Sequence, residues 1–182
     1  MKHKTIILDR DGVINEDSVG YIKSLAEWVP IPGSLQAIAD LSKSGFSVFV
    51  ITNQSGIGRG YYSLQAMQQI HDHMLQEVDK LGGAIQGIYF CPHHPDLQCE
   101  CRKPNTGMFL QLAKEHSVDL QQSFYVGDKL TDLQAGDGVN AQSILVKTGN
   151  GEDTLRHLAS DHFYLVYSCL SAFAKDVIDG KL

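Results

Sequence analysis

The chain has 182 residues, of which 43% are hydrophobic, and its 21 Asp and Glu outnumber 15 Lys and Arg to give a net charge of −6. This length and composition exclude a disordered chain and predict one domain over residues 1–182 that buries a substantial core. The negative charge counts against nucleic acid as a partner, because proteins that bind nucleic acid usually carry a basic surface.

No apolar run reaches the length of a membrane span, and Met1–Lys4 precedes the first apolar run directly, which leaves no room for a signal peptide. We therefore expect a cytoplasmic protein with no membrane partner, and we expect it to be a monomer. In a reducing compartment, four cysteines of which three are clustered indicate a metal site rather than disulfides.

Apolar runs with strand character alternate with helical patterns, which predicts an α/β fold with a central parallel sheet. The predicted strands cover residues 5–8, 46–51, 84–90, 123–126, 143–146 and 163–166. Helices are predicted over residues 34–45, 63–81, 108–116, 131–135 and 168–179. Ser34 and Ser63 are the candidate N-caps of the first two helices. We expect His71 and His73 to lie at the surface, and Cys169 to be a buried apolar group.

The first strand ends in two carboxylates. Asp9 and Asp11 follow the apolar run 6–8, and Gly12 comes next. Because side chains of a strand alternate with period two, both acids should point to one side just past its carboxyl end, where open α/β sheets bind ligands. Two acids held together need a compensating charge, and a divalent cation with oxygen ligands supplies it. Taken alone, the motif is equally well explained as an acidic turn after a strand.

Polar residues also follow two later strands and precede one helix. Parallel strands place their carboxyl ends along one edge, so these residues should meet the two acids: Thr52 and Asn53, Asp128 and Lys129, and the pair Arg102 and Lys103. Three carboxylates there predict a Mg²⁺ site, and a hydroxyl with cations predicts phosphate binding.

Residues 91–101 read C-x-H-H-x₄-C-x-C, and they are predicted to form a zinc-binding loop. Cys91, His93, Cys99 and Cys101 make a Cys₃His set, which is typical of a structural Zn²⁺ site with no open position. His94 is the alternative to His93 as the nitrogen ligand, and coincidental cysteines are the competing interpretation.

Together, D-x-D-G, a hydroxyl residue after the second strand, K-P and G-D-x-x-x-D resemble the motifs of haloacid dehalogenase-type phosphatases, over residues 5–149. The resemblance implies a Rossmann-like core with helices on both faces of the sheet. It implies that Asp9 is the nucleophile and Asp11 the general acid/base, while Thr52 and Lys103 hold the phosphoryl group. Asp9, the backbone carbonyl of Asp11, and Asp128 would bind Mg²⁺. Asp132 is interpreted as a supporting or helix-start residue.

The gaps between these motifs leave no room for a cap domain, so we expect an open site. Within the superfamily, the cysteine loop narrows the resemblance to two capless, zinc-containing groups. Residues 52–60, 8–15 and 126–130 resemble the D-glycero-D-manno-heptose-1,7-bisphosphate 7-phosphatases, whereas the short zinc loop is nearer in length to histidinol phosphatases. The loop near residues 17–21 carries one extra residue compared with the heptose phosphatases. The resemblance to these phosphatases implies the following substrate-binding residues: Asp17, Gly20, Tyr21, Asn53, Gln54, Ser55, Arg59, Arg102 and Lys129.

The sequence therefore predicts a Mg²⁺-dependent sugar-bisphosphate phosphatase of heptose and lipopolysaccharide core biosynthesis, acting on a small-molecule sugar phosphate. Histidinol phosphatase and polynucleotide 3′-phosphatase are the alternative activities. A zinc-knuckle module without catalysis is a third alternative, but no aromatic residue lies between Cys91 and Cys101 to stack on a base.

Overall fold

A computed structural model describes residues 5–159 and 163–182; residues 1–4 and 160–162 of the predicted domain lie outside the described residues. Six strands form one sheet in the order β3-β2-β1-β4-β5-β6, and each neighbouring pair is parallel. This arrangement confirms the predicted fold class. The strands are β1 (Thr5–Leu8), β2 (Ser47–Asn53), β3 (Gly87–Cys91), β4 (Ser123–Gly127), β5 (Gln142–Val146) and β6 (Leu165–Tyr167).

The direction in which the chain adds strands reverses beside β1. Strands β2 and β3 lie on one side of β1, and β4, β5 and β6 lie on the other. Leu8 of β1 pairs with Val50 of β2 and with Val126 of β4. Residues that follow these three positions therefore lie at the same edge of the sheet, and a reversal of this kind opens a crevice there.

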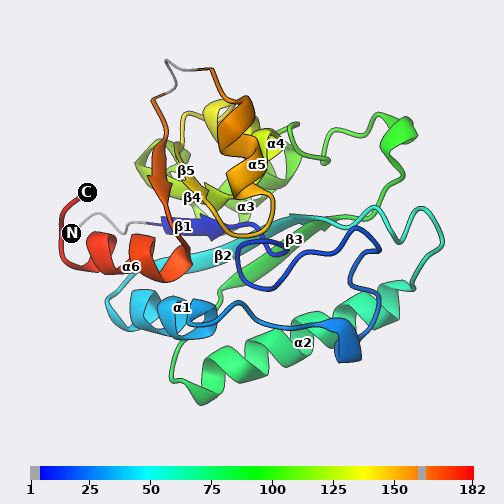
Figure 1. Ribbon diagram of the computed structural model, residues 1–182, viewed down its shortest axis with the longest axis horizontal. Helices are drawn as coiled ribbons and strands as arrows, with labels where there is room; N and C mark the ends of the chain where they lie inside the picture. Colours follow the sequence, from blue (N-terminus) through cyan, green and yellow to red (C-terminus); the bar gives the residue numbers. More distant parts are fainter. Residues whose placement is uncertain (1–4, 160–162) are drawn as a thin grey trace.

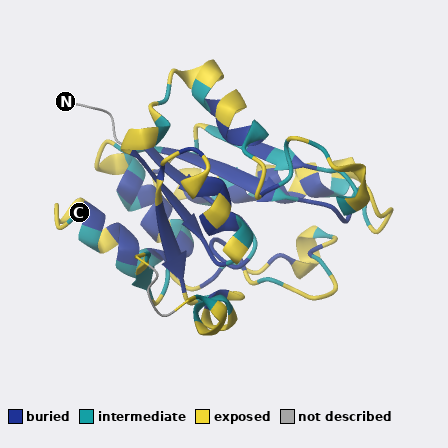
Figure 2. Cartoon of the chain, turned by 90° about the horizontal axis from the view of Figure 1, so that it is seen from above, coloured by how far each residue is buried: buried dark blue, intermediate teal, exposed yellow. Residues whose placement is uncertain are grey.

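Helices cover both faces of the sheet (Figure 1). Helices α1 (Ser34–Lys43), α2 (Leu64–Lys80) and α6 (Leu170–Ile178) pack on one face, and α3 (Gly107–His116) and α4 (Leu130–Asp137) pack on the other. Ile6 and Leu8 belong to the first core, whereas Ile7 belongs to the second, as the alternation of a strand requires. Figure 2 shows the central strands buried between the helices.

The remaining elements are short. Helix α5 (Gly151–His157) follows β5, and three 3₁₀ turns complete the described structure: η1 (Leu25–Glu27), η2 (Pro95–Leu97) and η3 (Leu120–Gln122). None of the helices in the described ranges combines the length and apolar character needed to cross a lipid bilayer.

Several local predictions were tested by these bounds. Ser63 caps α2, and its side chain accepts a hydrogen bond from the backbone N–H of Ala66. The prediction that Ser34 caps α1 was wrong: the cap is Gly33, at φ 82°, and the buried Ser34 hydroxyl donates instead to the carbonyl of Ile14. Cys169 is not buried either, because it is the half-exposed N-cap of α6.

Candidate active site

A cleft of about 350 Å³ opens at the carboxyl edge of the sheet. The ends of β1, β2 and β4 and the loop after β3 contribute to its wall, because parallel strands bring these ends together. The predicted site residues that line it are Asp9, Asp11, Tyr21, Thr52, Asn53, Ser55, Arg102, Lys103 and Lys129, and Thr131 and Asp132 join them.

Lys103 is the buried cation of this cleft, and only 3% of it is exposed. Its Nζ lies 2.8 Å from Oδ1 of Asp9 and 2.7 Å from Oδ1 of Asp132, and it donates to the hydroxyl of Tyr125 at 2.8 Å. Burial alone would lower the pKa of Lys103, but the charges of Asp132 and Asp9 raise it above the ordinary value. Lys103 is therefore a fixed positive charge at neutral pH.

The backbone of Lys103 is held by the end of β2. The side-chain amide of Asn53 donates to the Lys103 carbonyl, and its oxygen accepts from the Lys103 N–H, both at 3.1 Å. This pair of hydrogen bonds joins positions 50 residues apart in the chain and sets the direction in which the lysine enters the cleft.

Burial in this cleft disfavours the charged forms of Asp9 and Asp128. Burial raises the pKa of Asp9 to about 6, and burial together with the charge of Asp132 raises the pKa of Asp128 to about 8. Oδ1 of Asp128 is buried without a hydrogen-bond partner among the described residues. Carboxylate oxygens of Asp9, Asp128 and Asp132 lie within 4.8 Å of one another. Such a cluster of oxygens fits a divalent cation, which would lower both raised pKa values.

Glycine is required where the chain passes this cluster. Gly12 has φ +88°, and a Cβ built there would lie 2.2 Å from Oδ2 of Asp128. The backbone N–H of Asn150 reaches the same Asp128 oxygen at 2.7 Å. The absence of a side chain at Gly12 therefore makes room for the Asp128 carboxylate.

Asp11 is surrounded by donors rather than by other acids. Its Oδ1 accepts hydrogen bonds from Arg10 and from the side-chain amide of Asn15, and its Oδ2 accepts from Gln54 at 2.8 Å. Burial alone would raise the pKa of Asp11, but the charge of Arg10 and the hydrogen bonds of Asn15, Arg10 and Gln54 lower it below the ordinary value.

The structure places some predicted substrate-binding residues away from the cleft. Gln54 is buried and does not line the cleft, and Arg59 and Gly20 are exposed and do not line it either. Asp17 forms an ion pair with Lys129 at 2.8 Å in an adjoining cleft of about 370 Å³. Lys129 lines both clefts, so the two are neighbours.

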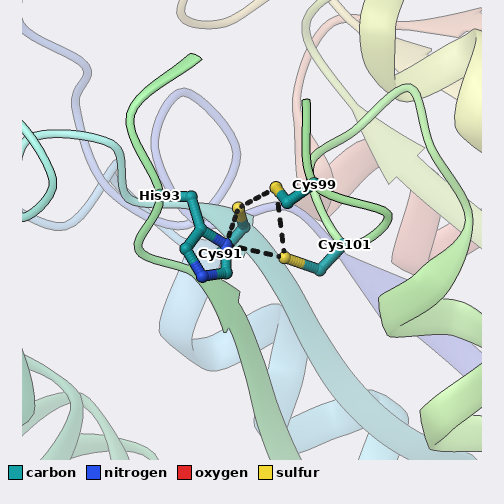
Figure 3. A group of neighbouring side chains, drawn as sticks. All are labelled: Cys91, His93, Cys99 and Cys101. Carbon is teal, nitrogen blue, oxygen red and sulfur yellow. Dashed lines mark hydrogen bonds between the residues drawn. The ribbon is translucent and has the colours of Figure 1, made fainter. Parts of the chain in front are cut away.

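The four predicted zinc ligands meet beside the end of β3 (Figure 3). Sγ of Cys91 lies 3.5 Å from Sγ of Cys99, and Nδ1 of His93 lies 3.2 Å from Sγ of Cys101. A tetrahedral zinc with Zn–S bonds of about 2.3 Å separates its ligand atoms by about 3.8 Å, so the spacing fits the ion. His94 is outside this cluster, and its Nδ1 accepts from the N–H of Asp96.

Three side chains of the site were missed by the sequence prediction or placed wrongly. Tyr125 and Arg10 were given no role, and the prediction that His71 lies at the surface was wrong, because only 1% of it is exposed. A signal for His71 was present: Met67 and Met74, four residues before it and three after it, lie on the buried face of α2. The prediction for His73 is also only partly met, since its ring packs edge-on against Trp28.

Comparison with known proteins gave consistent matches. A family model described as HAD-hydrolase-like matches residues 100–171. The chain is 49% identical over 175 residues to the D-glycero-beta-D-manno-heptose-1,7-bisphosphate 7-phosphatase of Pseudomonas putida, covering 96% of this chain and 99% of that protein. It is 47% identical over 152 residues to the protein of the same name from Bordetella bronchiseptica, covering 84% and 85% of the two chains.

Among solved structures, the chain is similar to a crystal structure of the D,D-heptose 1,7-bisphosphate phosphatase from B. bronchiseptica, complexed with magnesium and phosphate. The TM-score is 0.94 at 43% sequence identity, over 97% of this chain and 99% of that chain. The corresponding phosphatase from Burkholderia thailandensis matches with a TM-score of 0.75 at 37% identity, over 96% of this chain and 98% of that chain.

Proposed function

The chain belongs to the family of the D-glycero-beta-D-manno-heptose-1,7-bisphosphate 7-phosphatases, and we propose that it hydrolyses the 7-phosphate of the β anomer of this sugar bisphosphate. The family membership confirms the resemblance predicted from the sequence motifs. The observation that carries the proposal is the cleft in which the four residues Asp9, Asp11, Thr52 and Lys103 meet, in a chain that matches these phosphatases over nearly its whole length.

Asp9 is the proposed nucleophile. Its carboxylate attacks the phosphorus, the bond from phosphorus to the sugar oxygen breaks, and Asp11 gives a proton to that oxygen. Water then attacks the aspartyl-phosphate while Asp11 accepts its proton, which releases phosphate and restores Asp9. Lys103 contacts Oδ1 of Asp9 and fixes the carboxylate, while the lysine charge and the Thr52 hydroxyl stabilise the oxygens of the transferring group.

Asp11 has to be protonated in the first step and ionised in the second. Its lowered pKa means that it is ionised in the chain without substrate, which is the form that activates water. A phosphate dianion bound beside it raises the pKa by like-charge repulsion and favours the protonated form. Substrate binding therefore prepares the acid for the first step.

Mg²⁺ is the proposed catalytic cation, held by Asp9, Asp128 and the backbone carbonyl of Asp11. When bound, it neutralises charge on the phosphoryl oxygens and on the two aspartates. Oδ1 of Asp128, which has no hydrogen-bond partner within residues 5–159 and 163–182, and the raised pKa values of both aspartates support this assignment.

The second phosphate of the substrate needs cations away from Lys103. Arg102 lines the cleft, and its Nη1 is buried without a hydrogen-bond partner among the residues that the structure describes. Lys129 lines the same wall. We assign these two to the 1-phosphate and leave out Arg59, which lies outside the cleft. Histidinol phosphate carries an ammonium group at its far end, and Arg102 would repel it.

Zn²⁺ is proposed as a structural ion at Cys91, His93, Cys99 and Cys101. Four protein ligands leave no position for substrate, so this ion would not take part in the chemistry. The loop that it closes continues directly into Arg102 and Lys103, and the side chain of Asn105 donates to the Cys99 carbonyl at 2.8 Å. Zinc would therefore keep two cleft cations in place.

Phosphate release by the purified protein with Mg²⁺ tests the proposal. The substrates are both anomers of the heptose 1,7-bisphosphate, histidinol phosphate and a 3′-phosphorylated oligonucleotide. We expect the β anomer to have the highest kcat/KM. A higher kcat/KM on histidinol phosphate would overturn the proposed substrate assignment. If no phosphate is released from any of these esters, the proposed phosphatase activity is wrong. The role in lipopolysaccharide biosynthesis, the cytoplasmic location and the monomeric state stay predictions.

A further inference from the structure

The residue between Asp9 and Asp11 in the sequence is a buried arginine. Arg10 is fully buried, although the acids on either side of it line the cleft. Its Nε and Nη2 donate to Oδ1 of Asp11 at 3.0 and 2.8 Å, and Nη2 also reaches Oδ2 at 3.0 Å. The guanidinium is planar, so its orientation decides the orientation of the carboxylate that it holds.

The third nitrogen of Arg10 is held from a distant element. Nη1 lies 3.2 Å from Nε2 of His71, which is 61 residues away on α2. A guanidinium only donates, so Nε2 of His71 has to be the acceptor and the ring has to be neutral. Burial and the charge of Arg10 lower the pKa of His71 to about 3, which agrees with this requirement.

The donors divide unequally between the two oxygens of Asp11. Oδ1 accepts from Nε and Nη2 of Arg10 and from the amide of Asn15. Oδ2 accepts from Nη2 of Arg10 and from Gln54. Nη2 of Arg10 also donates to Oε1 of Gln54 at 3.2 Å, so its other N–H is shared between Oδ1 and Oδ2 of Asp11. A carboxylate oxygen has about two lone-pair positions, so the two unshared donors, Nε of Arg10 and the amide of Asn15, fill Oδ1, whereas Oδ2 has one unshared donor, Gln54. The arrangement thus leaves Oδ2 as the oxygen with room for a further partner.

We propose that Arg10 and His71 are positioning residues for Asp11, and that His71, through the guanidinium of Arg10, turns Oδ2 of Asp11 toward the oxygen of the leaving alcohol. The inference rests on the proposed function, because it needs Asp11 as the acid that protonates this oxygen. His71 is buried on α2 and does not line the cleft, so it acts on the chemistry without touching the substrate.

Two variants of His71 separate positioning from packing. His71→Gln keeps an acceptor at about the reach of Nε2, whereas His71→Phe keeps a ring and removes the acceptor. The assay compares kcat/KM for an alkyl ester, the heptose 1,7-bisphosphate, with kcat/KM for 4-nitrophenyl phosphate. kcat/KM reports the steps up to transfer of the phosphoryl group to Asp9, and nitrophenolate leaves without needing a proton.

We expect His71→Phe to lower kcat/KM on the alkyl ester by about 10- to 100-fold, part of the gain that a general acid provides, and on the aryl ester by less than about threefold. His71→Gln should recover most of the alkyl activity. Met74→Ala, on the same buried face of α2, is the control: it removes packing and should not change the ratio between the two esters.

Equal losses on both esters, or no recovery in His71→Gln, would overturn the positioning role. If His71→Phe does not fold, Arg10→Lys is tested instead. This variant keeps the charge but loses the planar guanidinium, so its kcat/KM should also fall more on the alkyl ester than on the aryl ester. An unchanged ratio in that variant also overturns the inference. Wild-type activity on other alkyl phosphates but not on the heptose ester would contradict only the proposed substrate, and the ratio is then measured on those esters. Inactivity on every ester would overturn both.

Discussion

Replacing Lys103 by Met tests how the cleft holds its charges. The lysine is buried and lies within 2.8 Å of both Asp9 and Asp132, and methionine has a similar length without charge. Removing one partner of a buried ion pair leaves an uncompensated carboxylate, which costs about 3–5 kcal/mol of unfolding free energy. Because both Asp9 and Asp132 lose their partner, we expect the loss of unfolding free energy at pH 7 to lie near the upper end of this range.

The pH dependence follows from the same charges. Without Lys103, the pKa values of Asp9 and Asp132 in the folded chain should lie above their unfolded value. A carboxyl group with a raised pKa destabilises the fold at pH values above its unfolded pKa, near 4. The difference between wild type and Lys103→Met should therefore shrink as the pH falls from 7 toward 4.

Urea denaturation in magnesium-free buffer measures both effects. The double variant Lys103→Met with Asp132→Asn removes one of the stranded charges and should be more stable than Lys103→Met alone, although two substitutions separate it from wild type. A loss below about 1 kcal/mol in the single variant, or a double variant no more stable than the single one, would refute the reasoning that these charges depend on Lys103.

Five further outcomes are expected. Asp9→Asn should abolish phosphate release, since an amide does not attack phosphorus usefully, and Asp11→Asn should lose about 10²- to 10⁴-fold in kcat; near-normal rates in steady-state assays would contradict these roles. Elemental analysis should find one zinc per wild-type chain and less than one in Cys99→Ala, which should also be less stable, and added Mg²⁺ should not restore its stability. Arg102→Ala should raise KM for the bisphosphate more than for a simple monophosphate ester, and equal effects would show that it does not bind the distal phosphate. Because the pKa of buried His71 is lowered to about 3 from 6.5, acid protonates the unfolded chain first, so wild type should lose stability relative to His71→Gln by up to about 1.4 kcal/mol per pH unit between pH 6 and pH 4 in urea titrations.

Short-range patterns in the sequence were enough to predict the sheet and the position of the cleft. Side chains of a strand alternate with period two, and parallel strands end at a common edge, so Asp9, Thr52 and Asp128 could be brought together without knowledge of any long-range contact. The meeting of Cys91, His93, Cys99 and Cys101 was predictable for a similar reason. These four residues lie within eleven residues, and spacing alone limits how they can fold around an ion.

Contacts between distant elements were decided only by the tertiary structure. Helical periodicity indicates that position 71 faces inward, but the strand register and the packing of α2 determine that it meets Arg10. Arg59 and Gln54 belong to the same sequence motif but have opposite environments. Arg59 is exposed, whereas the side chain of Gln54 is enclosed by Asp11, Thr52 and Tyr62. Composition and spacing carry no information on such differences, because burial and the partners of a polar group depend on what the rest of the chain places beside it.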